Sequence, residues 1–162
     1  MRLWHQILIP YLDNKRLLSQ HRECCALRGK GWGKKHSVVD YVFRHDLAHL
    51  YQYHLAVMDE MTNRDYTTDI KWYSRVYRGK QLNSSTLLEI GSYVFIDESE
   101  CPSSIENYIK SPWSLIYCEH DIAYLKECLL NLKSKKAQLK NNVSIEEMLI
   151  KIDLSGDMHE FR

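Results

Sequence analysis

Residues 14–28 read NKRLLSQHRECCALR, and this stretch decides the fold. Apolar and half-polar side chains recur in it at helical spacing, at positions 17, 18, 21, 24, 25 and 28. Asp13 can cap the start of a helix here, and Gly29 can end it. The pattern therefore predicts an amphipathic helix with one face against a core.

Two further segments carry the same periodicity. Apolar residues are spaced as on a helix from Leu47 to about Asn63, and again in a stripe that begins after Asp121. Ser144 to Glu147 fits a capping box, which predicts a short helix to about Ile152. Strand signals are scarce. We therefore expect an all-α fold: a single compact domain of three main helices with short helices and long loops.

The middle of the chain, residues 65–117, is harder to assign. Prolines at 102 and 112 and serine pairs at 84–85 and 103–104 interrupt the periodicity. Leu87 to Ile96 is compatible with a short helix or an extended segment, and the sequence leaves both open. With 162 residues the chain is long enough to bury a core of its own.

Charge is unevenly distributed along the chain. The formal net charge is only +1, but residues 1–80 carry +6 and residues 81–162 carry −5. A basic half favours a polyanionic partner, although a chance asymmetry remains the alternative. The five cysteines form no disulfide framework, no secretory signal is visible, and no run approaches the ~20 apolar residues of a membrane span. We expect a cytoplasmic protein.

The densest group of chemically active residues lies in the first predicted helix. Arg16, Gln20 and Glu23 fall on one side of it, and Arg22 adjoins Glu23. A carboxylate among cations is normally ionised, which suits a group that stabilises a cation or takes up a proton. Spacing alone favours the alternative, a surface helix with a salt bridge.

A glycine-spaced basic segment follows this helix. The glycines let backbone N–H groups approach phosphate oxygens, and Trp32 could stack on an unstacked base. Its polar and aromatic members are Arg28, Lys30, Trp32, Lys34, Lys35 and His36. A solvated basic loop is the alternative. Residues 71–80 repeat the basic–aromatic pattern more weakly, and core packing of the rings is the favoured interpretation there.

Histidines and cysteines raise the question of a metal. Neither a C-x-x-C pair nor an H-E-x-x-H motif occurs, and a buried, hydrogen-bonded His54 is more plausible than a ligand. We therefore expect no metal and no cofactor. A metal-dependent enzyme remains the less favoured alternative.

The order of several segments resembles the pyrimidine-dimer DNA glycosylase family of the phage endonuclease V type, in a bacterial branch of it. The segments are Leu17–Glu23, Gly33–Phe43, Leu47–Tyr66, Tyr77–Gly79 and Glu119–Asp121. The likeness covers most of residues 1–136, with 81–111 as a probable insertion. Residues 137–162 would form a C-terminal extension with a short helix.

The resemblance implies an all-α glycosylase and AP lyase that excises pyrimidine dimers or related damaged pyrimidines from double-stranded DNA. The terminal amine attacks C1′ of a sugar, an imine forms, and β-elimination cuts the strand. An α-amine has a pKa of ~7.7–8.0 against ~10.4 for lysine, so more of it is nucleophilic at neutral pH.

By match, Glu23 stabilises the cationic intermediate. Because Arg2 should hinder removal of Met1, the nucleophile would be the amine of Met1. Ala26 stands where the family has a basic residue, for which Arg28 can compensate. The expected DNA-binding residues are Arg2, Arg22, Arg28, Lys30, Trp32, Lys34, Lys35, His36 and Arg78. We expect a monomer; a non-catalytic DNA-binding protein on the same fold is the main alternative.

Overall fold

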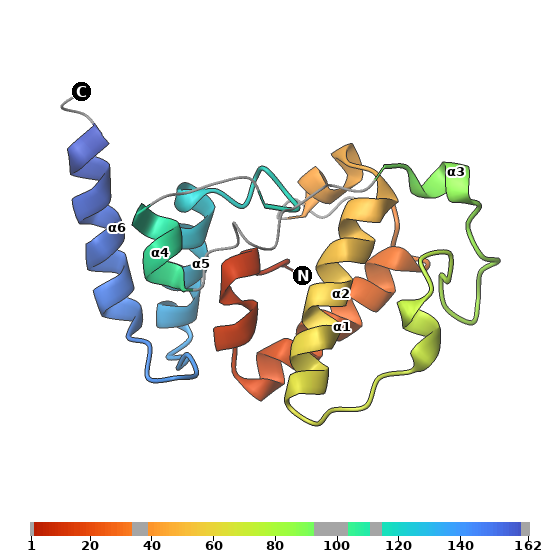
Figure 1. Cartoon of the computed structure of the whole chain (residues 1–162), viewed down its shortest axis with the longest axis horizontal. Helices are drawn as coiled ribbons and strands as arrows, with labels where there is room; N and C mark the ends of the chain where they lie inside the picture. The colour runs from red at the N-terminus through yellow and green to blue at the C-terminus, as the bar shows by residue number, and fades with distance from the viewer. Residues whose placement is uncertain (1, 34–38, 93–103, 111–114, 160–162) are drawn as a thin grey trace. The chain divides into compact units, whose positions relative to one another are not determined.

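A computed structural model describes residues 2–33, 39–92, 104–110 and 115–159. Every regular element among these residues is a helix, so the all-α prediction is confirmed (Figure 1). The chain gathers into two compact units, which are described separately below. Unit 1 comprises Met1–Leu3 and Asn14–Phe95, and unit 2 comprises Trp4–Asp13 and Ile96–Arg162.

Unit 1 is built on two helices that pack against each other, α1 (Asn14–Arg28) and α2 (Leu47–Asn63) (Figure 1). Both agree with the predicted ranges. Their contact buries apolar side chains such as Leu17, Leu27 and Val57, so burial of apolar surface stabilises the pair. Shorter elements complete the unit: η2 (Asp40–Arg44), η3 (Ile70–Tyr73) and α3 (Leu87–Ile90).

The C-terminal end of α1 is capped by the backbone of Gly31 and by the side chain of Arg78. The Gly31 N–H donates to the carbonyl of Ala26 at 2.8 Å, and a Cβ at residue 31 would lie 2.6 Å from that oxygen. Only glycine permits this approach. The guanidinium of Arg78 donates to the carbonyls of Arg28 at 3.0 Å and Gly29 at 3.4 Å, which satisfies groups that a helix end leaves open.

The segment after α3 is attached to the beginning of α2. Thr86 forms a capping box with Glu89, and α3 ends at Gly91, whose φ is +77°. The carboxylate of Asp46 accepts a hydrogen bond from the Ser92 N–H at 3.0 Å. A Cβ at residue 91 would lie 2.2 Å from Cγ of Asp46, so this attachment requires glycine. Of the stretch left open by the sequence, residues 87–90 are therefore helical.

Unit 2 contains η1 (Gln6–Tyr11), α4 (Ile105–Lys110), α5 (Ile122–Ser134) and α6 (Ile145–His159). The cap predicted at Ser144 is present, since its Oγ accepts from the Glu147 N–H at 3.3 Å, and α5 is capped by Asp121, which accepts from the Tyr124 N–H at 2.8 Å. The last helix extends beyond Ile152, where the sequence pattern had ended it. α5 and α6 belong to the same compact unit.

Nowhere in the described chain does a helix combine the length and the apolar character needed to cross a membrane. Among the described residues, the cysteines at 24, 25, 118 and 128 are not joined in disulfides.

Two buried histidines fasten the first turn of unit 2. Nδ1 of His5 accepts from the Ile7 N–H at 3.2 Å, and Nε2 of His5 donates to the carbonyl of His120 at 2.7 Å. The Gln6 N–H donates to Nδ1 of His120 at 3.0 Å. Burial lowers the pKa of His5 to about 4 and that of His120 well below its ordinary value, because a charged ring is poorly solvated there. Both rings are therefore neutral at pH 7.

This pair predicts that the free energy of unfolding falls as pH drops from 6.5 toward 4. The unfolded chain takes up protons on these histidines below pH 6.5, whereas the folded chain does not, so acid favours the unfolded state. His5 alone accounts for about 2 kcal/mol at pH 5. Urea unfolding at pH 7.5 and pH 5 measures the effect.

The matched variant is His5→Asn, which keeps an acceptor for the Ile7 N–H but has no ring to protonate. Its free energy of unfolding should vary less with pH than that of the wild type. Equal pH dependence in the two proteins would show that His5 contributes nothing to the acid sensitivity.

Candidate functional site

The carboxylate of Glu23 lies close in space to the N-terminal segment of the chain. Its Oε2 accepts a hydrogen bond from the backbone N–H of Arg2 at 3.3 Å and another from Nε2 of Gln20 at 3.2 Å. Glu23 is half-buried on α1, so its carboxylate combines fixed partners with access to solvent. The structure thus brings the N-terminal segment and the predicted catalytic carboxylate into direct contact.

A buried pair of side chains stands behind Glu23. Gln20 and Tyr53 are both fully buried, and the hydroxyl of Tyr53 donates to Oε1 of Gln20 at 3.3 Å. Helical spacing had placed Gln20 on the same side of α1 as Glu23. The role of Tyr53 was missed, because nothing in the periodicity of α2 distinguishes a ring that touches a polar partner from a core aromatic.

The guanidinium of Arg28 is the other polar centre of unit 1. It is 1% exposed, and it donates to the carbonyls of Trp72 at 2.8 Å, Ser74 at 2.7 Å and Tyr77 at 3.2 Å. It also lies 5.0 Å from the ring centre of Tyr51. This placement does not fit the expected DNA-binding role of Arg28, since a buried guanidinium occupied by carbonyls cannot meet a phosphate.

Arg28 also fixes the protonation of a neighbouring histidine. Its Nη1 lies 3.0 Å from Nδ1 of His54. Because a guanidinium can only donate, that Nδ1 must accept, and Nε2 of His54 therefore carries the hydrogen. Nε2 lies 2.8 Å from Nδ1 of His21, whose Nε2 lies 3.7 Å from Sγ of Cys25. A directed chain of hydrogen bonds runs from Arg28 to Cys25.

The same three side chains, His21, Cys25 and His54, are of the types that bind zinc, and their ligand atoms lie within 4.8 Å of one another. The hydrogen on Nε2 of His54 argues against a metal, because a protonated nitrogen has no lone pair to offer. Burial lowers the pKa of both histidines and raises that of Cys25 to about 12, so all three are neutral at pH 7. The donor set fits a hydrogen-bonded core.

The remaining predicted DNA-binding residues are placed in different ways. Arg22 and Lys30 are exposed, with Nη2 of Arg22 donating to Oγ of Ser19 at 3.2 Å. Trp32 is half-buried and packs edge-on against Phe43. Arg78 closes the end of α1, as described above. Predictions for Met1, Lys34, Lys35 and His36 lie outside the described residues.

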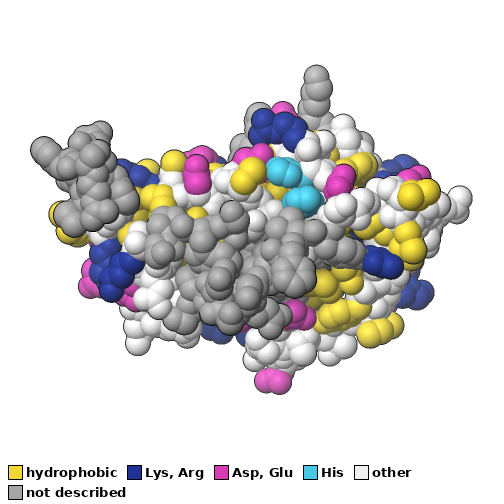
Figure 2. Space-filling model, turned by 45° about the horizontal axis from the view of Figure 1, so that its top comes forward, with side chains coloured by type: hydrophobic (Ala, Val, Ile, Leu, Met, Phe, Trp, Pro, Cys, Tyr) yellow, Lys and Arg dark blue, Asp and Glu magenta, His cyan; other side chains and the backbone are white. Residues whose placement is uncertain are grey.

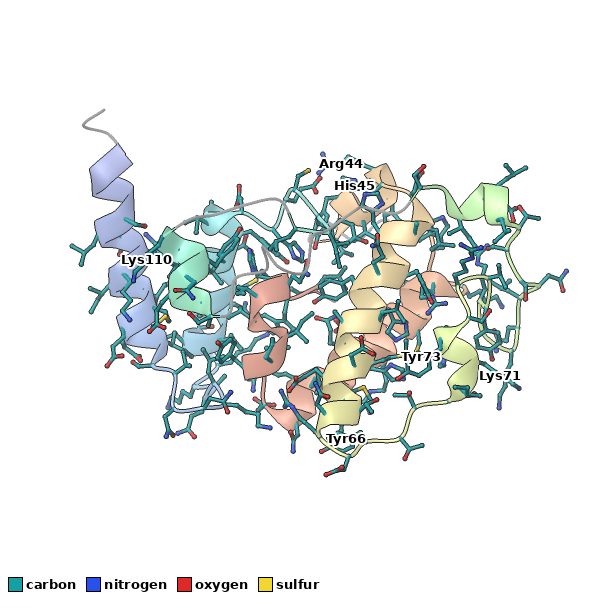
Figure 3. All side chains as sticks on the ribbon, viewed as in Figure 1. Arg44, His45, Tyr66, Lys71, Tyr73 and Lys110 are labelled. Atoms are coloured by element: carbon teal, nitrogen blue, oxygen red, sulfur yellow. The ribbon has the colours of Figure 1, made fainter. Side chains whose placement is uncertain are left out.

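On the face shown in Figure 2, Lys and Arg side chains alternate with acidic and uncharged ones and do not gather into one patch. The second basic–aromatic segment, residues 71–80, uses its rings for packing. Trp72 lies edge-on to Tyr77, with ring centres 4.9 Å apart. Tyr73, labelled in Figure 3, is held at its carbonyl by the hydroxyl of Tyr51 at 2.8 Å. These rings pack against neighbouring residues, but Trp72, Tyr73 and Tyr77 are half-buried and none of residues 71–80 lies in the buried core.

Comparison with known proteins agrees with the resemblance inferred from sequence. Residues 1–74 match the family model of the pyrimidine dimer DNA glycosylases, which supports the suspected family over that stretch. The matched residues include Arg2, Gln20, Glu23 and Tyr53. No significant match was found among curated proteins, and none among solved structures.

The Arg28 geometry predicts a large loss of stability on substitution. Arg28→Met removes the donor of three backbone carbonyls and of Nδ1 of His54, and should lower the free energy of unfolding by about 3 kcal/mol. Arg28→Lys should not rescue it, because an ammonium cannot reproduce the planar fork. Urea unfolding measures both, with the exposed Arg75→Met as control. An Arg28→Met variant as stable as the control would contradict the inferred role.

The directions of these hydrogen bonds predict that the cluster of His21, Cys25 and His54 does not bind zinc. Addition of equimolar Zn²⁺ should leave the melting temperature unchanged, and a chelator should not lower it, because His54 offers no free nitrogen. Calorimetry in the presence and absence of the ion measures this. A rise in melting temperature that is lost in Cys25→Ala would show that the chain rearranges to take up the metal.

Proposed function

We propose that this chain, whose residues 1–74 match the pyrimidine dimer DNA glycosylases, is a DNA-repair glycosylase with AP lyase activity. It would act in the cytoplasm, as a monomer, on double-stranded DNA that carries pyrimidine dimers or related damaged pyrimidines. Met1 would supply the nucleophilic amine and Glu23 the catalytic carboxylate.

One observation carries the proposal: the nitrogen of residue 2 lies 3.3 Å from Oε2 of Glu23. The two groups are 21 positions apart in sequence, and the contact lies within the family-matched stretch. A single peptide unit tethers the amine of Met1 to this nitrogen. An amine held near a carboxylate is what imine chemistry needs, because the reacting groups are already collected in one place.

The proposed reaction uses the amine and the carboxylate in turn. The amine lone pair attacks C1′ of the damaged nucleotide, the bond to the base breaks, and the base leaves with the electron pair and takes up a proton. The amine then loses its protons and the C1′–O4′ bond breaks, so that the sugar ring opens, O4′ leaves with the electron pair and takes up a proton, and the C=N bond of the imine forms. Loss of a proton from C2′ then expels the 3′ phosphate, and water finally releases the amine. Glu23 would stabilise the positive charge and carry protons between these steps.

The identity of the amine depends on whether Met1 is retained. If it is retained, the nitrogen near Glu23 is an amide, which cannot attack, and the nucleophile is the amine of Met1. If it is removed, that nitrogen becomes the free amine of Arg2. The bulk of Arg2 should hinder removal, so the proposal names Met1. An intact mass of the purified protein distinguishes the two.

The testing experiment is borohydride trapping on a duplex with one abasic site or one thymine dimer. Reduction of the imine should give a covalent protein–DNA adduct, and peptide mass spectrometry should locate it at residue 1. Glu23→Gln should reduce the trapped fraction at least about 100-fold, the scale of a lost acid–base or electrostatic catalyst.

Glu60→Gln is the matched control, since Glu60 lies on α2 and pairs with Arg64 at 2.6 Å. It should trap DNA as well as the wild type. Acetylation of the terminal amine should abolish trapping without abolishing DNA binding. Tight duplex binding with no adduct and no strand cleavage would refute the enzyme and favour the alternative, a non-catalytic DNA-binding protein on this fold.

A further inference from the structure

We infer that Gln20 is a positioning residue for Glu23 and that Tyr53 sets the orientation of its amide. The catalytic meaning of this inference rests on the function proposed above. The geometric part does not, because it concerns only how one carboxylate is held. Tyr53 on α2 contacts the buried side chain of Gln20 on α1, and Gln20 in turn contacts the carboxylate of Glu23.

The chemistry of the three groups permits one direction only. An ionised carboxylate accepts hydrogen bonds and donates none, so Gln20 must present its NH₂ group to Oε2 of Glu23. Its carbonyl oxygen then points the opposite way and needs a donor. The Tyr53 hydroxyl supplies that donor at 3.3 Å. A flipped Gln20 amide would put oxygen against oxygen at Glu23 and NH₂ against the hydroxyl, losing the contact to the carboxylate.

Burial makes this orientation firm. Gln20 and Tyr53 are 0% exposed, so water cannot replace either partner. A buried amide without hydrogen bonds destabilises the fold. Both the NH₂ group and the carbonyl oxygen of Gln20 therefore need partners in this helix–helix contact. The amide that donates to Glu23 and the hydroxyl that orients this amide are thus both supplied by buried residues.

One carboxylate oxygen of Glu23 accepts two hydrogen bonds. Oε2 of Glu23 receives the Gln20 amide from one side and the Arg2 N–H from the chain start. Gln20 therefore sets where the carboxylate stands relative to the N-terminal segment. In the proposed reaction this distance decides how well Glu23 faces the developing cation, so loss of the amide should lower turnover more than substrate binding.

Two substitutions test the inference at different strengths. Gln20→Met keeps the volume and removes the hydrogen bonds to Glu23 and to Tyr53, whereas Tyr53→Phe removes only the hydroxyl that orients the amide. The matched control is Tyr51→Phe, a tyrosine on the same helix whose hydroxyl donates to the carbonyl of Tyr73 at 2.8 Å, away from Glu23. Melting temperatures of all three variants establish that each is folded.

The first measurement is independent of activity. A pH titration of the Glu23 side-chain carboxyl resonance, by ¹³C NMR on the full chain, should show its midpoint raised by about one pH unit in Gln20→Met, because the ionised form loses a donor. Tyr53→Phe should shift it in the same direction by less, and Tyr51→Phe should not shift it. An unchanged midpoint in Gln20→Met overturns the inference.

The second measurement uses the proposed reaction. For cleavage of abasic-site duplex, Gln20→Met should lower kcat about tenfold with KM nearly unchanged, and Tyr53→Phe should lower it less. In the double variant Tyr53→Phe should add no further loss, since both act through one amide. Additive losses would overturn the inference by assigning each residue a separate structural effect.

Failure of the proposed function would look different. If the wild type forms no adduct and cuts no DNA, the enzyme proposal fails, and the NMR titration still decides whether Gln20 holds the carboxylate. If the wild type is active but Gln20→Met changes neither kcat nor the midpoint, the positioning inference fails and the function stands.

Discussion

A buried guanidinium imposes the strictest constraint on unit 1. Arg28 can only donate hydrogen bonds, so every group around it must accept. The carbonyls of the segment 72–77 are drawn to it, which fastens that segment to the end of α1. The same requirement forces Nδ1 of His54 to be unprotonated and so determines the direction of the hydrogen bonds onward to His21. One side chain therefore organises both the loop and the histidine tautomers, while burial lowers the pKa of His21 and His54 and keeps both rings neutral.

α1 carries two polar stripes with identical spacing. Positions 16, 20 and 23 form one and positions 21, 25 and 28 the other, each at i, i+4 and i+7. The first stripe includes Glu23, which contacts the N-terminal segment. The second includes Arg28 and the histidine–cysteine cluster around it. Adjacent residues of α1 meet adjacent residues of α2, Gln20 with Tyr53 and His21 with His54. One helix pair thus serves both a structural centre and the candidate catalytic carboxylate.

This duplication explains what the sequence could and could not predict. Periodicity located α1 and α2 and put Gln20 beside Glu23, because helical spacing is a local property. It could not assign Arg28 to the core, since a glycine-spaced basic segment looks the same whether its first cation faces phosphate or three carbonyls. The orientation of an arginine depends on residues 44 to 49 positions away, which no local pattern contains. The contact between Arg2 and Glu23 is equally non-local.

The proposed reaction requires the N-terminal backbone to be ordered. Chain ends usually fray, yet within unit 1 Leu3 is 0% exposed and the Arg2 N–H donates to Glu23. A lysine nucleophile would have to immobilise a long side chain, at a cost of about 2 kcal/mol of rotamer entropy, whereas an α-amine needs only its backbone fixed. The hydrogen bond from the Arg2 N–H to Oε2 of Glu23 provides such a backbone contact directly after residue 1, before any substrate binds.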